Sequence, residues 1–308
     1  MRPSHWVKNA FVLAPVLFSG EFVEPMNWVW AVSAAVAFCL LSSAVYLTND
    51  IADRREDAAH PLKRGRPIPS GRLSVSAATA GALGCAAGGL GLAAAVTVHT
   101  SGAAGPLHGL GLLVWAGGYL ALNLLYSFWL KAHAIVDVIV VALGFVLRAV
   151  AGAAAISVPI SPWMVLCTFT LCLYIALTKR RSEFVSRSAE EAVAARPAQR
   201  GYALDDLDHM LTVSTALAIL TYSLYCLAPR TVSPGGVGSA HLIWTIPLVV
   251  YGLFRYNRAT RRTAQDPVSV LLHDKVMWLV VLGYVLVAAL VIRFGSMPAV
   301  RNVLDVKQ

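Results

Sequence analysis

The chain has 308 residues, of which 57% are hydrophobic and 13% charged, and its formal net charge is +9. Soluble domains carry about a quarter charged residues, so this composition excludes an ordinary soluble protein. The basic residues gather in alternate loops between apolar runs, so the positive charge indicates membrane topology and no nucleic-acid partner.

Nine apolar stretches are candidates to cross about 30 Å of hydrocarbon as helices. They cover roughly residues 8–20, 27–48, 74–98, 106–125, 134–156, 161–178, 209–228, 239–257 and 276–294. The first is short and contains Pro15, which predicts a half-span or a kinked helix. A secretory signal is the alternative, but Pro15 interrupts the run and no small-residue cleavage site precedes Glu21. The runs do not alternate as in a membrane barrel, so we predict an all-α polytopic membrane protein.

The distribution of Lys and Arg predicts the orientation. With nine spans, one side of the membrane carries 20 of these residues and the other carries 4, while Arg148 lies within a span. Positive loops remain in the cytoplasm. We therefore expect a cell-membrane protein with a cytoplasmic N-terminus and active site and an external C-terminus.

Three aspartates, Asp50, Asp53 and Asp57, follow the second apolar run at positions i, i+3 and i+7. If the preceding helix continues through them, their carboxylates share one face. Clustered oxygen ligands suit Mg²⁺, and Mg²⁺ in turn suits a diphosphate. The basic segment 60–67 follows at once and can bind phosphate oxygens. The local chemistry predicts a metal–diphosphate site at the membrane surface.

A second polar cluster lies between Asn123 and Asp137. Asp137 is expected near the mouth of a cavity, where its carboxylate can join a metal site. On a helix, Arg148 follows Asp137 on the same face, roughly 16 Å deeper. Two interpretations of Arg148 stay open: a structural charge satisfied by carbonyls and a buried acid, or a binding group for an anionic ligand.

Two further loops are ambiguous. The basic residues from Lys179 to Arg181 fit a juxtamembrane anchor as well as substrate binding. Asp274 precedes the last apolar run, where it can favour a helix N-terminus or border the site.

The pattern Asn49-Asp50-x-x-Asp53-x-x-x-Asp57 resembles the first aspartate-rich motif of the UbiA superfamily of intramembrane prenyltransferases. This resemblance implies nine transmembrane helices around a central cavity, with the polar site under cytoplasmic loops. It also implies one UbiA-like domain over residues 1–308. The expected cap loops are about 49–73, 126–133, 179–208 and 255–275.

Within that superfamily, the segments 2–9, 60–68, 126–131 and 137–152 are similar to the branch of decaprenyl-phosphate phosphoribosyltransferases. Late segments, 254–256 and 271–274, share this similarity. The branch implies Mg²⁺-dependent transfer of a 5-phosphoribosyl group from phosphoribosyl pyrophosphate to a polyprenyl phosphate, for cell-wall arabinan precursors. The chain departs from many UbiA members at His133, where their second motif has an aspartate.

The resemblance also implies roles for individual residues. The expected catalytic residues are Asp50, Asp53, Asp57 and Asp137. The expected metal ligands are Asn49, Asp50, Asp53 and Asp57. The expected substrate-binding residues are Lys8, Lys63, Arg64, Arg66, Tyr126, Lys131, Arg148 and Lys179.

Two rival functions compete with this interpretation. An aromatic prenyltransferase of the same fold would use a prenyl diphosphate, a donor that needs fewer cations than these loops contain. A transporter without catalysis would also suit intramembrane charge, but the sequence has no sign of inverted repeats. A homo-oligomer is compatible with the sequence, which does not specify one.

Overall fold

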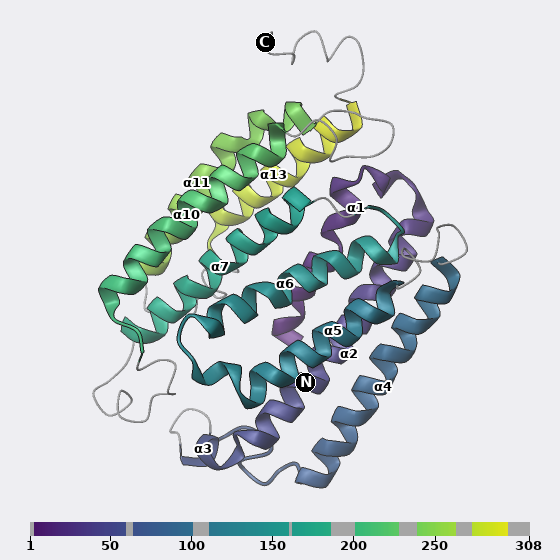
Figure 1. The fold of residues 1–308 in the computed structure, drawn as a ribbon, viewed down its shortest axis with the longest axis vertical. Coiled ribbons are helices and arrows are strands. Elements are labelled where there is room, and N and C mark those ends of the chain that lie inside the picture. Colours follow the sequence, from purple (N-terminus) through teal and green to yellow (C-terminus); the bar gives the residue numbers. More distant parts are fainter. Residues whose placement is uncertain are drawn as a thin grey trace. The chain divides into compact units, whose positions relative to one another are not determined.

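The computed structural model describes residues 3–59, 64–100, 111–159, 162–185, 201–227, 239–262 and 273–294. Within these ranges the ordered elements are all helices and no strand occurs, which confirms the predicted all-α class (Figure 1). The chain divides into two compact units. The first comprises Met1–Val16, Glu24–Lys131 and Gly144–Ile160, and the second comprises Leu17–Val23, Ala132–Leu143 and Ser161–Gln308.

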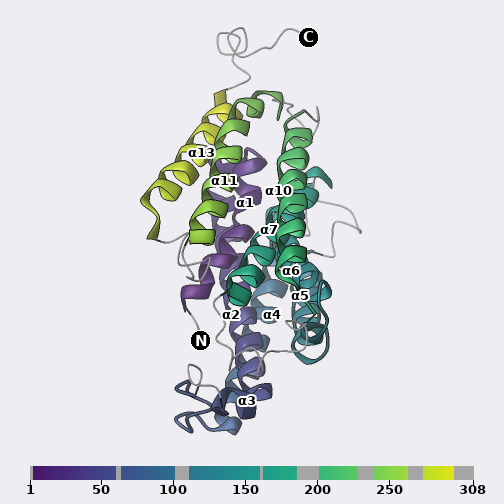
Figure 2. The ribbon, with the colours of Figure 1, turned by 90° about the vertical axis from the view of Figure 1, so that its left-hand side faces the viewer.

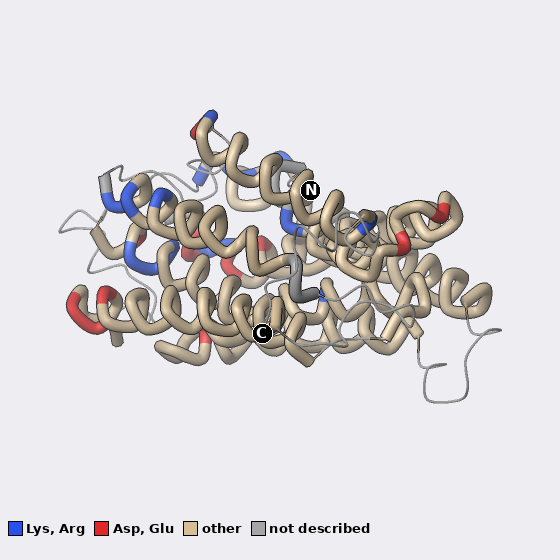
Figure 3. Tube along the Cα trace, turned by 90° about the horizontal axis from the view of Figure 1, so that it is seen from above, with Lys and Arg blue, Asp and Glu red and all other residues tan. Residues whose placement is uncertain are grey.

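Seven helices of the described residues are long and apolar enough to cross a membrane. They are α2 (Pro25–Ala52), α4 (Val75–Thr100), α5 (Gly111–Phe128), α6 (Val136–Ala155), α7 (Pro162–Val185), α10 (Leu204–Leu227) and α13 (Lys275–Phe294). Figure 3 shows charged residues as short blue and red stretches on helices that are otherwise tan.

Within the described part of the chain, neither of the other two expected spans forms a single apolar α-helix of 18 residues or more, so the count of nine is not confirmed. Near the N-terminus, the 3-10 helix η1 (Pro3–Val12) is followed by the five-residue helix α1 (Ala14–Phe18). Pro15 lies in the first turn of α1, where a missing N–H is tolerated. The stretch expected at 239–257 forms η6 (Ser239–Thr245) and α11 (Ile246–Arg262), which has 17 residues.

In the first unit, α2, α4 and α5 contact one another in pairs, and the ribbon shows them as neighbours (Figures 1 and 2). Phe38 and Leu41 of α2 are fully buried with Leu112 of α5. Gly89 of α4 lets the helices approach, because a Cβ there would lie 2.8 Å from the Leu41 side chain. Small residues at such contacts are typical of packing between membrane helices.

Gly152 of α6 makes the tightest such approach in the first unit. A Cβ at this position would lie 2.0 Å from the carbonyl oxygen of Val12, which is itself fully buried. No side chain fits between them, so glycine is required for α6 to pack against the end of η1.

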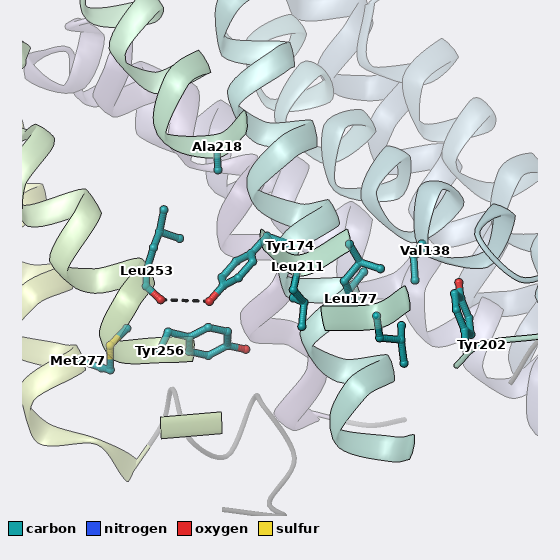
Figure 4. Packing of buried hydrophobic residues seen from close by; sticks show 11 residues of the cluster. Val138, Tyr174, Leu177, Tyr202, Leu211, Ala218, Leu253, Tyr256 and Met277 are labelled. Carbon is teal, nitrogen blue, oxygen red and sulfur yellow. Dashed lines mark hydrogen bonds between the residues drawn. The ribbon is translucent and has the colours of Figure 1, made fainter. Parts of the chain in front are cut away.

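In the second unit, α7, α10, α11 and α13 form the helical body (Figure 2). Its buried cluster includes Tyr174, Leu211 and Tyr256 (Figure 4). The Tyr174 hydroxyl donates a hydrogen bond to the Leu253 carbonyl oxygen over 3.1 Å, which satisfies a polar group inside an apolar cluster.

The length of α2 positions the acidic cluster. Its 28 residues extend about 42 Å at 1.5 Å per residue, which exceeds a hydrocarbon core of about 30 Å. Pro25 starts the helix at a position where proline is favoured. The polar last turn can therefore lie beyond the hydrocarbon and lead directly into the short helix α3 (Arg54–Ala59).

Candidate active site

The acidic cluster straddles a break between two helices. Asp53 is the C-cap of α2, and its backbone N–H donates to the Asn49 carbonyl over 2.9 Å. The Asp57 N–H then donates to the Asp53 carbonyl over 2.8 Å. The condition that α2 continues through all three aspartates is therefore not met. Each of these two backbone hydrogen bonds joins residues four positions apart, as in an α-helix, so the backbone keeps a helical course near the break.

One guanidinium joins the two outer aspartates. Arg66 Nη1 lies 3.3 Å from Asp50 Oδ1 and also donates directly to Asp57 Oδ2. The Asp57 side chain is only 3% exposed, against 16% for Asp50 and 28% for Arg66. Since a buried carboxylate needs a partner, Arg66 compensates the charge of Asp57. Arg66, expected from the sequence to bind phosphate, thus contacts two of the expected metal ligands in this structure.

The middle aspartate has a different cation. Lys131 Nζ lies 2.5 Å from Asp53 Oδ1, and the two side chains are 20% and 12% exposed. Lys131 belongs to the short 3-10 helix η5 (Leu130–Ala132), which directly follows α5 in the chain. Lys131, which belongs to the polar cluster between Asn123 and Asp137, therefore lies beside the first aspartate motif within the first unit.

The donor chemistry of this cluster suits a divalent cation. Carboxylate oxygens are the ligands that Mg²⁺ prefers, and Asp50 and Asp57 already converge on one positive group, Arg66. Within the described residues, however, no three His, Cys, Asp or Glu side chains are gathered as a metal site would need. The residues fit Mg²⁺ by type, and in this structure each carboxylate contacts either Arg66 or Lys131.

Asp137 lies in the second unit with two other partners. The carboxylate is 1% exposed. Its Oδ2 lies 2.6 Å from Arg180 Nε, and its Oδ1 accepts a hydrogen bond from the Tyr202 hydroxyl over 2.7 Å. Arg180 also contacts Glu183 over 2.6 Å. Asp137, expected at a cavity mouth, is therefore buried and held by a cation and a hydroxyl.

Tyr202 also fixes an unusual backbone. Ile135, just before α6, has φ = +70°, a left-handed conformation that a β-branched residue rarely adopts. Its N–H donates to the Tyr202 oxygen over 2.6 Å. Burial, and then the hydrogen bond to Asp137, raise the pKa of the Tyr202 hydroxyl. The hydroxyl therefore stays protonated at neutral pH and can continue to donate to the carboxylate.

Arg148 is buried on α6 within the first unit, at 6% exposure. Its Nε donates to Asn9 Oδ1 over 2.9 Å, and its two terminal nitrogens donate to the Gly144 carbonyl and the Tyr119 hydroxyl over 3.0 and 2.7 Å. The guanidinium also lies 4.6 Å from the centroid of the Tyr119 ring. All three hydrogen-bond partners are neutral, so the buried acid considered for Arg148 is not among them.

The basic residues after Thr178 take part in ion pairs. Lys179 contacts Glu183 one turn along α7 at 3.7 Å, and its side chain is 45% exposed. Arg181 Nε lies 2.7 Å from Asp208 Oδ1, an oxygen that Arg261 also approaches at 2.8 Å. Asp208 thus links α7, α10 and α11 within the second unit, a structural role for a residue that the sequence did not single out.

The other expected site residues differ in position and burial. Asn49 and Tyr126 are half-buried on α2 and α5, Lys8 is half-buried on η1, and Arg64 is exposed. Lys63 lies outside the described residues.

Asp274 has both a structural partner and a capping role. Arg255 contacts both of its carboxylate oxygens, at 3.1 and 3.0 Å. Oδ1 also accepts the backbone N–H groups of Val276 and Met277 at the start of α13. The hydrogen bond from Arg255 is the main reason that the pKa of Asp274 is lowered. The interpretation as a helix-favouring acid therefore fits the geometry.

Sequence reasoning missed the partners that hold the buried charges, above all Tyr202, Tyr119 and Asp208. Tyr202 reaches Asp137 across 65 positions, and Tyr119 reaches Arg148 across 29. No local spacing indicates such pairs. Asn9 alone had a signal, because it lies within the N-terminal segment singled out for its similarity.

The helices and charge clusters together define a membrane-embedded protein whose polar groups suit an anionic substrate. A family model described as the UbiA prenyltransferase family matches residues 10–282. The chain therefore belongs to the UbiA prenyltransferase family. It is a transferase of the UbiA superfamily and a multi-pass membrane protein.

Curated relatives have similar length and sequence. The chain is 30% identical over 306 residues to a decaprenyl-phosphate phosphoribosyltransferase of Mycobacterium tuberculosis, covering 96% of this chain and 93% of that protein. It is 31% identical over 288 residues to the protein of the same name from Corynebacterium glutamicum, covering 92% and 83%.

Solved structures share the fold. A UbiA homologue from Archaeoglobus fulgidus bound to Cd²⁺ matches with a TM-score of 0.66 and 16% identity, covering 94% of this chain and 97% of that one. The same homologue bound to DMAPP and Mg²⁺ gives 0.63 and 17%, covering 92% and 99%. At these identities the likeness concerns the fold alone.

Proposed function

We propose that this protein transfers the 5-phosphoribosyl group of phosphoribosyl pyrophosphate to a polyprenyl phosphate of the decaprenyl type, for cell-wall arabinan precursor synthesis. The observation that carries the proposal is the pairing of Asp50 and Asp57 with Arg66, and of Asp53 with Lys131. Such a site contains both the oxygen ligands for a cation and the cations for a diphosphate. Relatives about 30% identical bear the name of this activity.

The acidic residues would hold the metal. Asn49, Asp50, Asp53 and Asp57 supply oxygen atoms at the end of α2 and the start of α3. Bound Mg²⁺ would neutralise charge that develops on the diphosphate leaving group. The Mg²⁺-bound UbiA homologue, which also binds DMAPP, supports the use of a divalent metal in this fold.

The basic residues would bind the phosphates. Arg66 and Lys131 contact the acidic cluster directly, and Arg64 precedes Arg66 on an exposed turn. An arginine binds phosphate oxygens through two parallel N–H groups, whereas lysine acts as a point charge. Lys63 and Lys8 complete the proposed set of cations.

The reaction itself exchanges one bond at C1 of the ribose. The bond from C1 to the diphosphate oxygen breaks, and its electron pair leaves with the diphosphate. A lipid phosphate oxygen forms the new bond to C1. The sugar becomes oxocarbenium-like between these events, by analogy with glycosyl transfer. A phosphate with a second pKa near 6 is largely ionised at neutral pH, so the attack requires no general base.

Asp137 would act through its partners. With 1% exposure and contacts to Arg180 and Tyr202, its proposed role is to position these residues and the turn at Ile135. Arg148, Tyr126 and Lys179 remain proposed contacts for substrate. For Arg148 the neutral partners leave a positive charge that a bound anion would stabilise.

The membrane part would hold the lipid. The polyprenyl chain is apolar, and the long helices expose apolar side chains such as Leu83, Leu279 and Leu286. The proposed orientation has the polar site and the N-terminus in the cytoplasm, as the positive-inside rule predicts. The single UbiA-like domain with cap loops stays part of this proposal.

A transfer assay tests the function. Purified protein in nanodiscs would be incubated with Mg²⁺, radiolabelled phosphoribosyl pyrophosphate and a polyprenyl phosphate, and the label in the lipid phase would be counted. We expect transfer that EDTA abolishes and that Asp53→Asn reduces by at least about a hundredfold, since it removes a proposed metal ligand. Asp205→Asn, an exposed aspartate of α10, is the matched control and should retain activity.

A further inference from the structure

We propose that Arg66 and Lys131 are exchangeable counter-ions. They pair with the three aspartates before substrate arrives, which offsets part of the negative charge, and then transfer to the diphosphate. The site would therefore bind metal and diphosphate with strong positive cooperativity and would bind the metal alone weakly. This inference rests on the proposed function, since it concerns the same metal–diphosphate site.

The first argument is the burial of Asp57. Its side chain is 3% exposed and accepts directly from Arg66, whose Nη1 also lies 3.3 Å from Asp50. An unpaired buried carboxylate is costly, so without metal a cation must stay beside it. Arg66 supplies that cation and at the same time draws together two of the proposed ligands.

The second argument is that Asp53 repeats the arrangement with a different residue. Lys131 Nζ lies 2.5 Å from Asp53 Oδ1. Every carboxylate of the motif thus contacts a side-chain cation, and within the described residues no three acidic or histidine side chains gather around a point. The cations stand where a metal would have to approach.

The third argument concerns charge. A metal ion that displaced Arg66 and Lys131 by itself would place three positive groups around the aspartates and leave two of them poorly compensated. A diphosphate supplies the anionic oxygens that these two side chains then need. Binding energies linked in this way are reciprocal, so diphosphate must raise metal affinity by the same factor as metal raises diphosphate affinity.

The two side chains are suited to this exchange. Arg66 and Lys131 are 28% and 20% exposed, so each reaches solvent while contacting a carboxylate that is more buried. Lysine has a flexible four-carbon stem, and arginine has a fork that matches phosphate geometry. Each can rotate from a carboxylate to an incoming phosphate without backbone movement.

The test measures binding rather than turnover. The whole protein in nanodiscs would be titrated with Mn²⁺ alone, with bound Mn²⁺ followed by loss of the free-ion electron paramagnetic resonance signal. Retention of radiolabelled inorganic pyrophosphate would then be measured at fixed free Mn²⁺. We expect Lys131→Gln and Arg66→Gln each to raise the affinity for Mn²⁺ alone about tenfold, or about 1.4 kcal/mol. The same variants should lower pyrophosphate retention about tenfold.

Exchange predicts that the same substitution has opposite effects on the two ligands, with tighter binding of Mn²⁺ and weaker binding of pyrophosphate. Arg54→Gln is the matched control, because Arg54 is an exposed cation of the same segment whose guanidinium donates to the Ile51 carbonyl oxygen over 3.2 Å. It should change neither quantity more than about twofold. Lys131→Gln serves if Arg66→Gln fails to fold, because the Lys131 pair is separate from Asp57.

Two failures are distinguishable. If the wild type retains pyrophosphate with Mn²⁺ and transfers phosphoribosyl, but Arg66→Gln and Lys131→Gln leave Mn²⁺ affinity unchanged or weaken it, the exchange is overturned and the proposed function stands. If the wild type retains pyrophosphate no better with Mn²⁺ than without, and Asp53→Asn changes nothing, the metal–diphosphate site is overturned and the exchange with it.

Discussion

Arg180 Nε lies 2.6 Å from Asp137 Oδ2, and this ion pair links α7 to the start of α6 inside the second unit. The aspartate is 1% exposed and the arginine 12% exposed. A pair this buried is expensive to break from one side, because the remaining charge loses its partner. Arg180 therefore holds in place the Asp137 end of the polar cluster that runs from Asn123 to Asp137.

We predict that Arg180→Gln destabilises the protein by about 3–5 kcal/mol, the usual cost of leaving a buried charge unpaired. The thermal midpoint in detergent, followed by size-exclusion chromatography, would measure the loss. Lys179→Gln removes a neighbouring charge that is 45% exposed and should change the midpoint little. Adding Asp137→Asn to Arg180→Gln should recover part of the loss. A midpoint for Arg180→Gln equal to that of Lys179→Gln would contradict the pairing.

Tyr202→Phe removes the hydroxyl that donates to Asp137 and accepts from Ile135 N–H. We predict a loss of about 1–3 kcal/mol, because both partners are left incompletely bonded. The raised pKa of Tyr202 sets the pH dependence. Its stabilisation is fully present below about pH 10, the ordinary tyrosine pKa, and decreases only as the pH rises through the higher folded value. The difference in midpoint between wild type and Tyr202→Phe should therefore be constant from pH 6 to pH 9.

Two substitutions of Asp274 can separate its role as the cap of α13 from its ion pair with Arg255. Asp274→Ala removes both and should cost about 1 kcal/mol from the helix cap, whereas Asp274→Asn keeps a capping oxygen and should cost less. Because the pKa of Asp274 is lowered, its stabilisation is present above about pH 4, the ordinary aspartate pKa, and is lost as the pH falls through the folded value. Thermal midpoints of the two variants at pH 7 check the order, and equal losses would contradict capping.

Gly152→Ala should disrupt the first unit. The new methyl group would overlap the Val12 carbonyl, 2.0 Å away, and overpacking of this kind costs about 1–3 kcal/mol. Gly84→Ala is the control, since nothing lies within 4 Å of its would-be Cβ. Expression and the thermal midpoint in detergent would report the difference. Equal midpoints for the two variants would show that η1 does not pack closely against α6.

The sequence predicted the helical class and the acidic–basic cluster because both depend on local patterns. Long apolar runs indicate membrane helices, and Asp50, Asp53 and Asp57 lie within 16 positions of Arg66. It did not predict the helix break at Asp53, since the i, i+3, i+7 spacing fits an unbroken helix equally well. Residues 8–20 were expected to form a half-span or a kinked helix, and they form the end of η1 and the short helix α1. The short length of α11 was not predicted, because hydropathy does not locate where a 3-10 segment replaces an α-helix.

Long-range partners were the least predictable part. Lys131 was selected as a phosphate ligand, yet its contact with Asp53 spans 78 positions. Asp137 was expected at an open mouth, and its burial depends on Tyr202 and Arg180, which only tertiary packing brings to it. Sequence reasoning thus identified which residues carry charge, and the fold determined which charges neutralise one another.

The most direct test of the central claim is to identify the lipid product by mass spectrometry. Protein in nanodiscs would receive Mg²⁺ with phosphoribosyl pyrophosphate and polyprenyl phosphates of several lengths, and separately a prenyl diphosphate with an aromatic acceptor. The account predicts a polyprenyl phosphate that has gained one phosphoribosyl group and no prenylated aromatic product. A prenylated aromatic product, with no phosphoribosyl lipid at any chain length, would contradict it.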